Sequence, residues 1–209
     1  MPAPELLPTF LLATALVCAA PGPDLAFVVA SGIAGGPRAG VLAALGMSGG
    51  MLVHTTLAAL GLAALLRTAP VLLDGVRLLG AGYLLWLAAV TLRAARHAGI
   101  PERGPDGAGA ILRRAFVTNL ANVKVVLFFA AFLPQFVRPD RGSPTLQFVV
   151  LGLLFLVVGL SIDVTAGLAA GRIRASLARG SRLPVVLDVG AALVFASIAA
   201  FLLVEVLHV

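Results

Sequence analysis

Four ionisable residues stand out because each lies inside a long apolar stretch: Asp24, His54, Lys124 and Asp163. An ammonium and a carboxylate can bind the two charged ends of a zwitterion, and carboxylates and imidazoles can also carry protons. Ionisable groups within a membrane are costly and usually mark solute or proton pathways. These residue types indicate binding and proton transfer rather than covalent catalysis, and the sequence contains none of the familiar enzyme signatures. We therefore do not expect an enzyme.

Each of these residues also has a simpler interpretation. Asp24 can cap the helix that follows it, His54 can be a satisfied interior histidine, and Asp163 can be a structural partner of Lys124. Lys124 is the single lysine in a chain that otherwise uses arginine, and it lies near the middle of its apolar stretch. A lysine at this position, in a chain that otherwise uses arginine, indicates that a compact, flexible ammonium is required there. Because a buried charge adds nothing obvious to folding, we expect replacement of Lys124 by Met to preserve the fold.

The composition is that of a membrane protein. The chain has 209 residues, of which 60% are hydrophobic and 11% charged, and its mean hydropathy is +1.08. Soluble domains usually carry ~25% charged residues, so the apolar surplus requires lipid as a second solvent. The net charge is +6, but the arginines are spread between apolar stretches, which argues against nucleic acid as a partner. With Cys18 as the only cysteine, a disulfide within the chain and a Cys-rich metal site are excluded. No metal or cofactor is expected.

Six stretches are long enough to cross a bilayer as helices, which takes ~20 apolar residues. They are residues 6–31, 39–66, 71–92, 112–137, 145–170 and 184–207. The predicted fold is all-α, a single transmembrane transporter domain over residues 1–209 with six helices arranged as two inverted three-helix repeats. The repeat halves are about 1–95 and 110–209, joined by a linker of about 93–111.

Arginine placement predicts the orientation. The first, third and fifth connectors hold most of the arginines, and cytoplasmic loops carry the excess of positive charge. Both termini are therefore expected outside a cytoplasmic membrane, with the 93–111 linker inside the cell. The first basic residue is Arg38, so the basic segment of a removable signal peptide is missing and the first stretch is expected to remain as a span.

Two of the expected spans contain helix-breaking sequences. In the first, Pro21-Gly22-Pro23-Asp24 removes backbone donors and allows a sharp turn. In the fourth, Asn119-Leu120-Ala121-Asn122-Val123-Lys124 places polar side chains in mid-span. Matched interruptions in the two halves of a transporter point to its central binding site.

Motifs in four spans occur in the order and at the spacing of a known family. They are Pro21-Gly22-Pro23-Asp24; Gly46-Met47-Ser48-Gly49 followed by His54; Gly80-Ala81-Gly82-Tyr83-Leu84-Leu85-Trp86; and Asn119 to Lys124 followed by Phe132-Leu133-Pro134-Gln135-Phe136-Val137. Together they resemble the LysE family, which comprises lysine and threonine/homoserine exporters, over nearly the whole chain. One departure is Val123, where the family pattern has proline. Because valine keeps its backbone donor, we expect the fourth helix to be less broken than is usual in the family.

The resemblance implies proton-coupled efflux of amino acids or related small metabolites. The substrate-binding residues that it implies are Pro21, Gly22, Pro23, Asp24, Asn119, Asn122 and Lys124. The candidates for proton coupling are Asp24, Asp163 and His54. The expected partners are the small-molecule substrate, protons and the lipid bilayer, and a homodimer is compatible with the sequence. Export of a metal cation or of another solute is the alternative within transport, and a membrane scaffold without transport is the alternative outside it.

Overall fold

The computed structural model describes residues 2–64, 82, 85, 89 and 107–172. Within these residues the regular elements are helices and no strand occurs, which confirms the predicted all-α class for this part of the chain. The expected spans 71–92 and 184–207 lie outside the described residues, except that residues 82, 85 and 89 are helical. The arrangement of six helices as two inverted repeats stays a prediction.

The first expected span is interrupted where the prolines predicted it. A short 3-10 turn, η1 (Pro4–Leu6), leads into helix α1 (Leu7–Ala19), and helix α2 (Pro23–Leu57) begins three residues further on. Ala20 and Gly22 between them have extended backbones, as the residue before a proline prefers. Pro23 opens α2, a position where its missing N–H would have no helical partner in any case.

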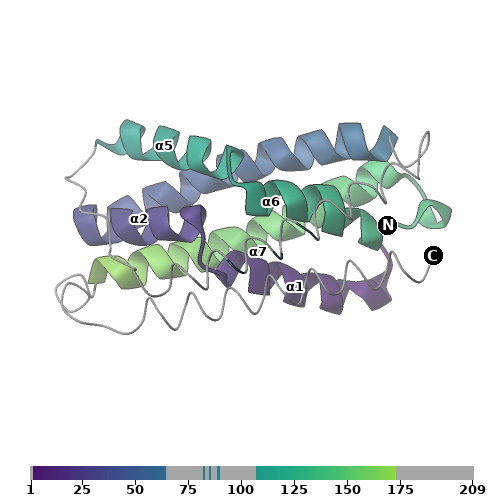
Figure 1. Ribbon diagram of the computed structural model, residues 1–209, viewed down its shortest axis with the longest axis horizontal. Coiled ribbons are helices and arrows are strands. Elements are labelled where there is room, and N and C mark those ends of the chain that lie inside the picture. Colours follow the sequence, from purple (N-terminus) through teal and green to yellow (C-terminus); the bar gives the residue numbers. More distant parts are fainter. Residues whose placement is uncertain (1, 65–81, 83–84, 86–88, 90–106, 173–209) are drawn as a thin grey trace.

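Helix α2 consists of two arms that meet at Gly36. This glycine has φ 77° and ψ −174°, a conformation outside the helix that side chains disfavour. Figure 1 shows the chain reversing direction there, so that the second arm runs back along the molecule. Phe27 and Val28 of the first arm share a buried cluster with Ala43 and Met47 of the second. The predicted connector at residues 35–38 is therefore a tight turn between two packed helical arms.

The fourth expected span is also interrupted. Helix α5 (Ala108–Leu120) and helix α6 (Val123–Leu127) are bent by 46° at the break between them. A π-helical segment, η3 (Phe128–Phe132), and a 3-10 segment, η4 (Leu133–Phe136), continue from α6. The break forms although no proline is present, because Ala121 and Asn122 leave the helical conformation and Asn122 caps the helix that follows.

Helix α7 (Pro144–Arg172) packs along both arms of α2. The two helices touch backbone to backbone, since a Cβ atom built on Gly40 would lie 2.6 Å from the carbonyl oxygen of Gly167. Gly50 approaches the side chain of Asn119 on α5, and Gly159 approaches the side chain of Met51 on α2. The glycines of the second and fifth spans thus allow close contacts between helices.

Several of these helices are suited to a membrane by length and composition. Pro23–Leu62, which is divided at Gly36, and Pro144–Arg172 are long and apolar enough to cross one. The bent pair of Ala108–Leu120 and Val123–Phe136 is a third candidate if it counts as one span. These candidates overlap four of the six predicted spans.

A cluster of phenylalanines fills the interior of one half of the molecule. Phe10 of α1 contacts Phe128 and Phe136, with ring centroids 6.1 and 5.2 Å apart, and Phe128 lies 4.8 Å from Phe155 of α7. The aromatic cluster consists of Phe10, Phe128, Phe129, Phe132, Phe136 and Phe155. It lies on the side of the two helix breaks that carries the N-terminus (Figure 1).

Candidate functional site

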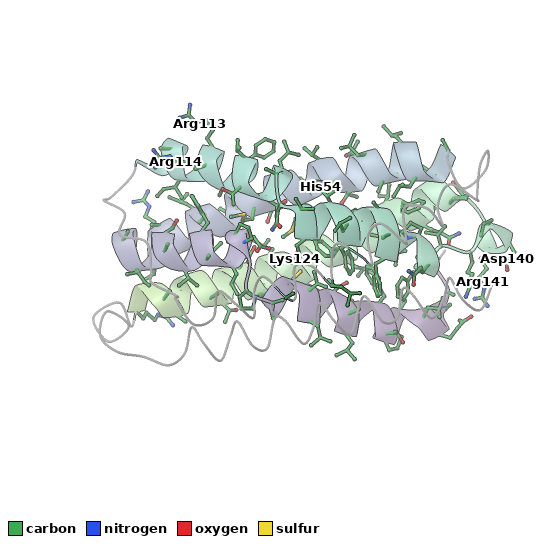
Figure 2. All side chains as sticks on the ribbon, viewed as in Figure 1. His54, Arg113, Arg114, Lys124, Asp140 and Arg141 are labelled. Atoms are coloured by element: carbon green, nitrogen blue, oxygen red, sulfur yellow. The ribbon has the colours of Figure 1, made fainter. Side chains whose placement is uncertain are left out.

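The two helix breaks meet at one buried ion pair. The Nζ atom of Lys124, from the start of α6, lies 3.0 Å from Oδ1 of Asp24, from the start of α2. The same Nζ donates a 3.0 Å hydrogen bond to the carbonyl oxygen of Ala20. Both charged side chains are almost inaccessible, with 2% and 5% of their surface exposed. Figure 2 shows Lys124 near the middle of the long axis of the molecule.

Local backbone structure at the first break makes this approach feasible. A Cβ atom on Gly22 would lie 2.8 Å from Asp24 Oδ1 and 3.1 Å from Lys124 Nζ, so a larger residue would push the pair apart. The break also ends α1 at Ala19 and leaves the Ala20 carbonyl free to accept a bond from Lys124. Sequence reasoning missed this carbonyl, although the signal was present: Pro21 fixes Ala20 in an extended conformation.

At the second break, Asn122 orients Lys124. Its side-chain Oδ1 accepts a 3.1 Å hydrogen bond from the backbone N–H of Lys124, which is the usual way for an N-cap residue to satisfy the first turn of a helix. Val123 is the first residue of that helix, the position at which proline is favoured. Asn122 therefore caps the start of α6, and Val123 takes the first helical position, where the resemblance led us to expect proline.

Asp163 lies close to the pair but is not its partner. It is on α7, 2% exposed, and within electrostatic range of both Asp24 and Lys124. Its Oδ2 atom has no hydrogen-bond partner among the described residues. A structural pair of Asp163 with Lys124 was one interpretation of the sequence, but the structure pairs Lys124 with Asp24 instead. The site thus contains two carboxylates and one ammonium.

His54 of α2 contacts Asn119, which lies near the end of α5. The Nε2 atom of His54 is 3.3 Å from the backbone oxygen of Asn119, and the His54 ring lies 5.8 Å from that of Phe129. His54 therefore meets a carbonyl in the last turn of α5 that also accepts a 2.9 Å hydrogen bond from the backbone N–H of Asn122. The Asn119 side chain, packed against Gly50 and fully buried, has no hydrogen bond on either its oxygen or its nitrogen.

Unpaired polar atoms gather at this site. Buried polar side-chain atoms nearly always have hydrogen-bond partners, yet the described residues include seven that do not. Four of these seven belong to the site and have no partner of any kind among the described residues, on Asn119, Asn122 and Asp163; a fifth, Asp24 Oδ1, is the atom that Lys124 pairs with. Such a concentration of unsatisfied donors and acceptors is suited to a polar ligand that has both kinds of group.

Two further residues, Cys18 and Met51, border the charged groups and were not predicted as site residues. Cys18 is within electrostatic range of Lys124, Asp24 and Asp163. A Cβ atom on Gly159 would lie 3.4 Å from the Cys18 sulfur and 3.1 Å from the Met51 sulfur. These side chains provide an apolar wall, and only the tertiary structure shows that they are neighbours. In the described part of the chain, no group of three or more His, Cys, Asp or Glu side chains is placed to hold a metal ion.

Interrupted membrane helices that meet at buried charges define a solute transporter. The chain belongs to the LysE type translocator family, whose pattern matches residues 15–206. It is 38% identical over 152 residues to the leucine efflux protein of Klebsiella pneumoniae, covering 72% of each chain. It is 37% identical over 149 residues to the leucine efflux protein of an Enterobacter species, covering 68% of this chain and 69% of the other. An uncharacterized membrane protein of Pseudomonas aeruginosa is 37% identical over 156 residues, with 72% of each chain covered. No solved structure is significantly similar to the chain.

Proposed function

We propose that this protein exports amino acids from the cytoplasm across the cell membrane in exchange for protons. The observation that carries the proposal is the buried Lys124–Asp24 pair at the junction of two helix breaks, surrounded by polar atoms that lack partners. An α-amino acid has one carboxylate and one ammonium, so it complements a site with one lysine and two aspartates. The relatives named as leucine efflux proteins favour an aliphatic amino acid such as leucine.

Binding proceeds by exchange of ionic partners. The substrate carboxylate takes the place of Asp24 beside Lys124, and the substrate ammonium pairs with the carboxylate that is released. The number of buried charge pairs then rises from one to two, and no charge is left isolated, which limits the desolvation cost. The start of α2 beside Asp24 adds the positive end of a helix dipole for the carboxylate. The unpaired amides of Asn119 and Asn122 complete the polar wall.

Proton exchange uses the second carboxylate. Two aspartates and one lysine leave a surplus negative charge in a buried site, and one proton on a carboxylate removes that surplus. Asp163, which is not committed to Lys124, is our first candidate for this proton, with Asp24 second. His54 is the weaker candidate, because it lies against the Asn119 backbone and has a positioning role there.

The charges at the two ends support an orientation with both termini outside. Arg38, Arg113, Arg114 and Arg172 lie at the end with the Gly36 turn and the start of α5 (Figures 1 and 2). The opposite end carries Glu5, Arg138, Asp140 and Arg141, in which acidic and basic residues balance. An excess of arginine marks the cytoplasmic side.

Efflux from proteoliposomes tests the proposal. Vesicles containing the purified protein are loaded with radiolabelled leucine, and its release is measured with and without an imposed pH gradient. We expect release above that of protein-free vesicles, accelerated when the receiving side is acidic. Arg141→Met, which removes a charge from an exposed ion pair, is the control and should transport normally. If neither leucine nor any other amino acid in a panel moves, the proposal is wrong. If leucine moves but a pH gradient does not change its rate of release, only the proton-exchange part of the proposal is excluded.

A further inference from the structure

A second unpaired polar group lies outside this site, on helix α1. Thr14 is fully buried, and its Oγ1 atom has no hydrogen-bond partner among the described residues. Hydroxyl groups within helices commonly bond to the carbonyl four residues earlier. Among the described residues, five serines and threonines do so: Ser48, Thr55, Thr56, Ser161 and Thr165. The Thr14 hydroxyl makes no such bond, so it is available to another partner.

The position of Thr14 links the ion pair to the aromatic cluster. Phe10, Thr14 and Cys18 follow one another at intervals of one helical turn on the buried face of α1. Cys18 is within electrostatic range of Lys124, and the helix ends just beyond it, near the carbonyl of Ala20 that binds Lys124. At the other side, Phe10 packs on the aromatic cluster. Along α1, Thr14 thus lies between Cys18, near the charged site, and Phe10, in the aromatic cluster.

A structural role does not explain a hydroxyl at this point. Thr14 Oγ1 caps no helix, bonds no backbone group and joins no described side chain. An unpaired buried hydroxyl opposes folding, and threonine is no better than valine as a helix former. A valine of the same shape would serve the packing of α1 at least as well. The hydroxyl is therefore best understood through a partner that is present only during transport.

We propose that the Thr14 hydroxyl binds the polar head of the transported amino acid as it moves from Lys124 toward the aromatic cluster. This inference rests on the proposed function. Thr14 lies six positions before Ala20, which is about 9 Å along a helix. Because Lys124 bonds to the Ala20 carbonyl, Thr14 offers a second contact point for a substrate that leaves Lys124. A hydroxyl can donate to a carboxylate or accept from an ammonium. Because it is neutral, it holds either group less tightly than a charged residue and allows release.

Replacement of Thr14 by Val separates this role from a structural one. Thr14→Val keeps the shape and removes only the hydroxyl, so the melting temperature of the purified protein should stay equal or rise. The maximal rate of leucine efflux should fall about tenfold, the value expected for loss of one hydrogen bond in the rate-limiting step. Thr14→Ser keeps a hydroxyl and should retain most of the rate. Thr55→Val, which removes a back-bonded hydroxyl, is the matched control and should keep the wild-type rate.

Three results would overturn the inference. An unchanged efflux rate for Thr14→Val, beside active wild-type protein, refutes the Thr14 contact and leaves the proposed function intact. A clear drop in the melting temperature of Thr14→Val assigns the hydroxyl a structural role. Equal loss of rate in the Ser and Val variants shows that shape rather than the hydroxyl matters. If wild-type protein moves no amino acid, the proposed function itself fails, and the inference fails with it.

Discussion

Neutralising Lys124 perturbs the ion pair with the least change in shape. At the observed separation of 3.0 Å, two unit charges attract by about 5.5 kcal/mol at an effective dielectric constant of about 20. Desolvation of both groups offsets much of this attraction, but removal of one partner leaves the other charge buried, at a cost of ~3–5 kcal/mol. Lys124→Met also removes the bond to the Ala20 carbonyl. We therefore expect its free energy of unfolding to fall by about 3–5 kcal/mol.

The measurement is a double-mutant cycle with Asp24→Asn, read both as thermal unfolding and as efflux. For a chain of this length, 1 kcal/mol corresponds to roughly 2–4 °C in melting temperature, so Lys124→Met should melt roughly 6–20 °C lower. The double variant Lys124→Met/Asp24→Asn contains no unpaired charge at these positions and should recover most of the lost stability. Efflux should stay at background in Lys124→Met and in the double variant, because the group that binds the substrate carboxylate is absent from both.

The efflux of the double variant decides between the two roles of the pair. If the pair only stabilises the fold, restoring stability restores transport, and the assignment of Lys124 as a substrate ligand is refuted. If Lys124→Met alone melts normally and transports substrate, the pair has neither role. Asp163→Asn in the same background is the control for charge, since Asp163 lies near the pair without bonding to Lys124.

The structure supports four further predictions. Val123→Pro should fold and transport, because position 123 opens α6 and Asn122 before it is already extended; loss of folded protein in size-exclusion chromatography would contradict this. Gly167→Ala should lower the melting temperature by overpacking, since its Cβ would lie 2.8 Å from a backbone carbon of α2, whereas Gly109→Ala meets nothing within 4 Å and should not. In a cysteine-free background, a cysteine at exposed Asp140 should react with an impermeant reagent in intact cells and one at exposed Gly107 should not; the reverse pattern would invert the orientation. Leucine at 100 times its dissociation constant should stabilise the wild-type protein by about 2.7 kcal/mol, and a melting temperature unchanged by any amino acid would contradict a preformed site.

The helix breaks were predictable because their causes are local. Pro21, Gly22 and Pro23 act on the backbone of their own residues, and the structure ends α1 and begins α2 around them. The turn at Gly36 was predictable for the same reason. The break between α5 and α6 depends on the Asn122 cap. It was predicted from the polar residues, but its sharpness was not, because a single valine at position 123 does not distinguish the start of a helix from its interior.

The partner of Lys124 could not be predicted. Asp24 and Asp163 both lie in apolar stretches at some depth, and the choice between them depends on how the helices pack. The structure places Gly22 against the ammonium, and this contact brings Asp24 within reach. The expectation that Lys124→Met would fold normally rested on an unpaired lysine; because Asp24 is buried beside it, we now expect destabilisation. Non-local contacts also bring Phe10 and Phe155 to Phe128, Phe132 and Phe136, of which only the last three share a helical spacing in the sequence.

The distribution of unpaired polar atoms connects stability to transport. Each buried donor or acceptor without a partner costs ~1–3 kcal/mol relative to a satisfied group, so a protein selected for stability alone would replace them. In the described residues four of these atoms lie on Asn119, Asn122 and Asp163, and two further ones lie on Thr14 of α1 and on Gln135. A substrate that carries one carboxylate and one ammonium can satisfy several of them at once and then leave. The empty protein thus keeps unpaired polar atoms at the proposed binding site and on the path that the substrate is proposed to follow, and binding can satisfy them.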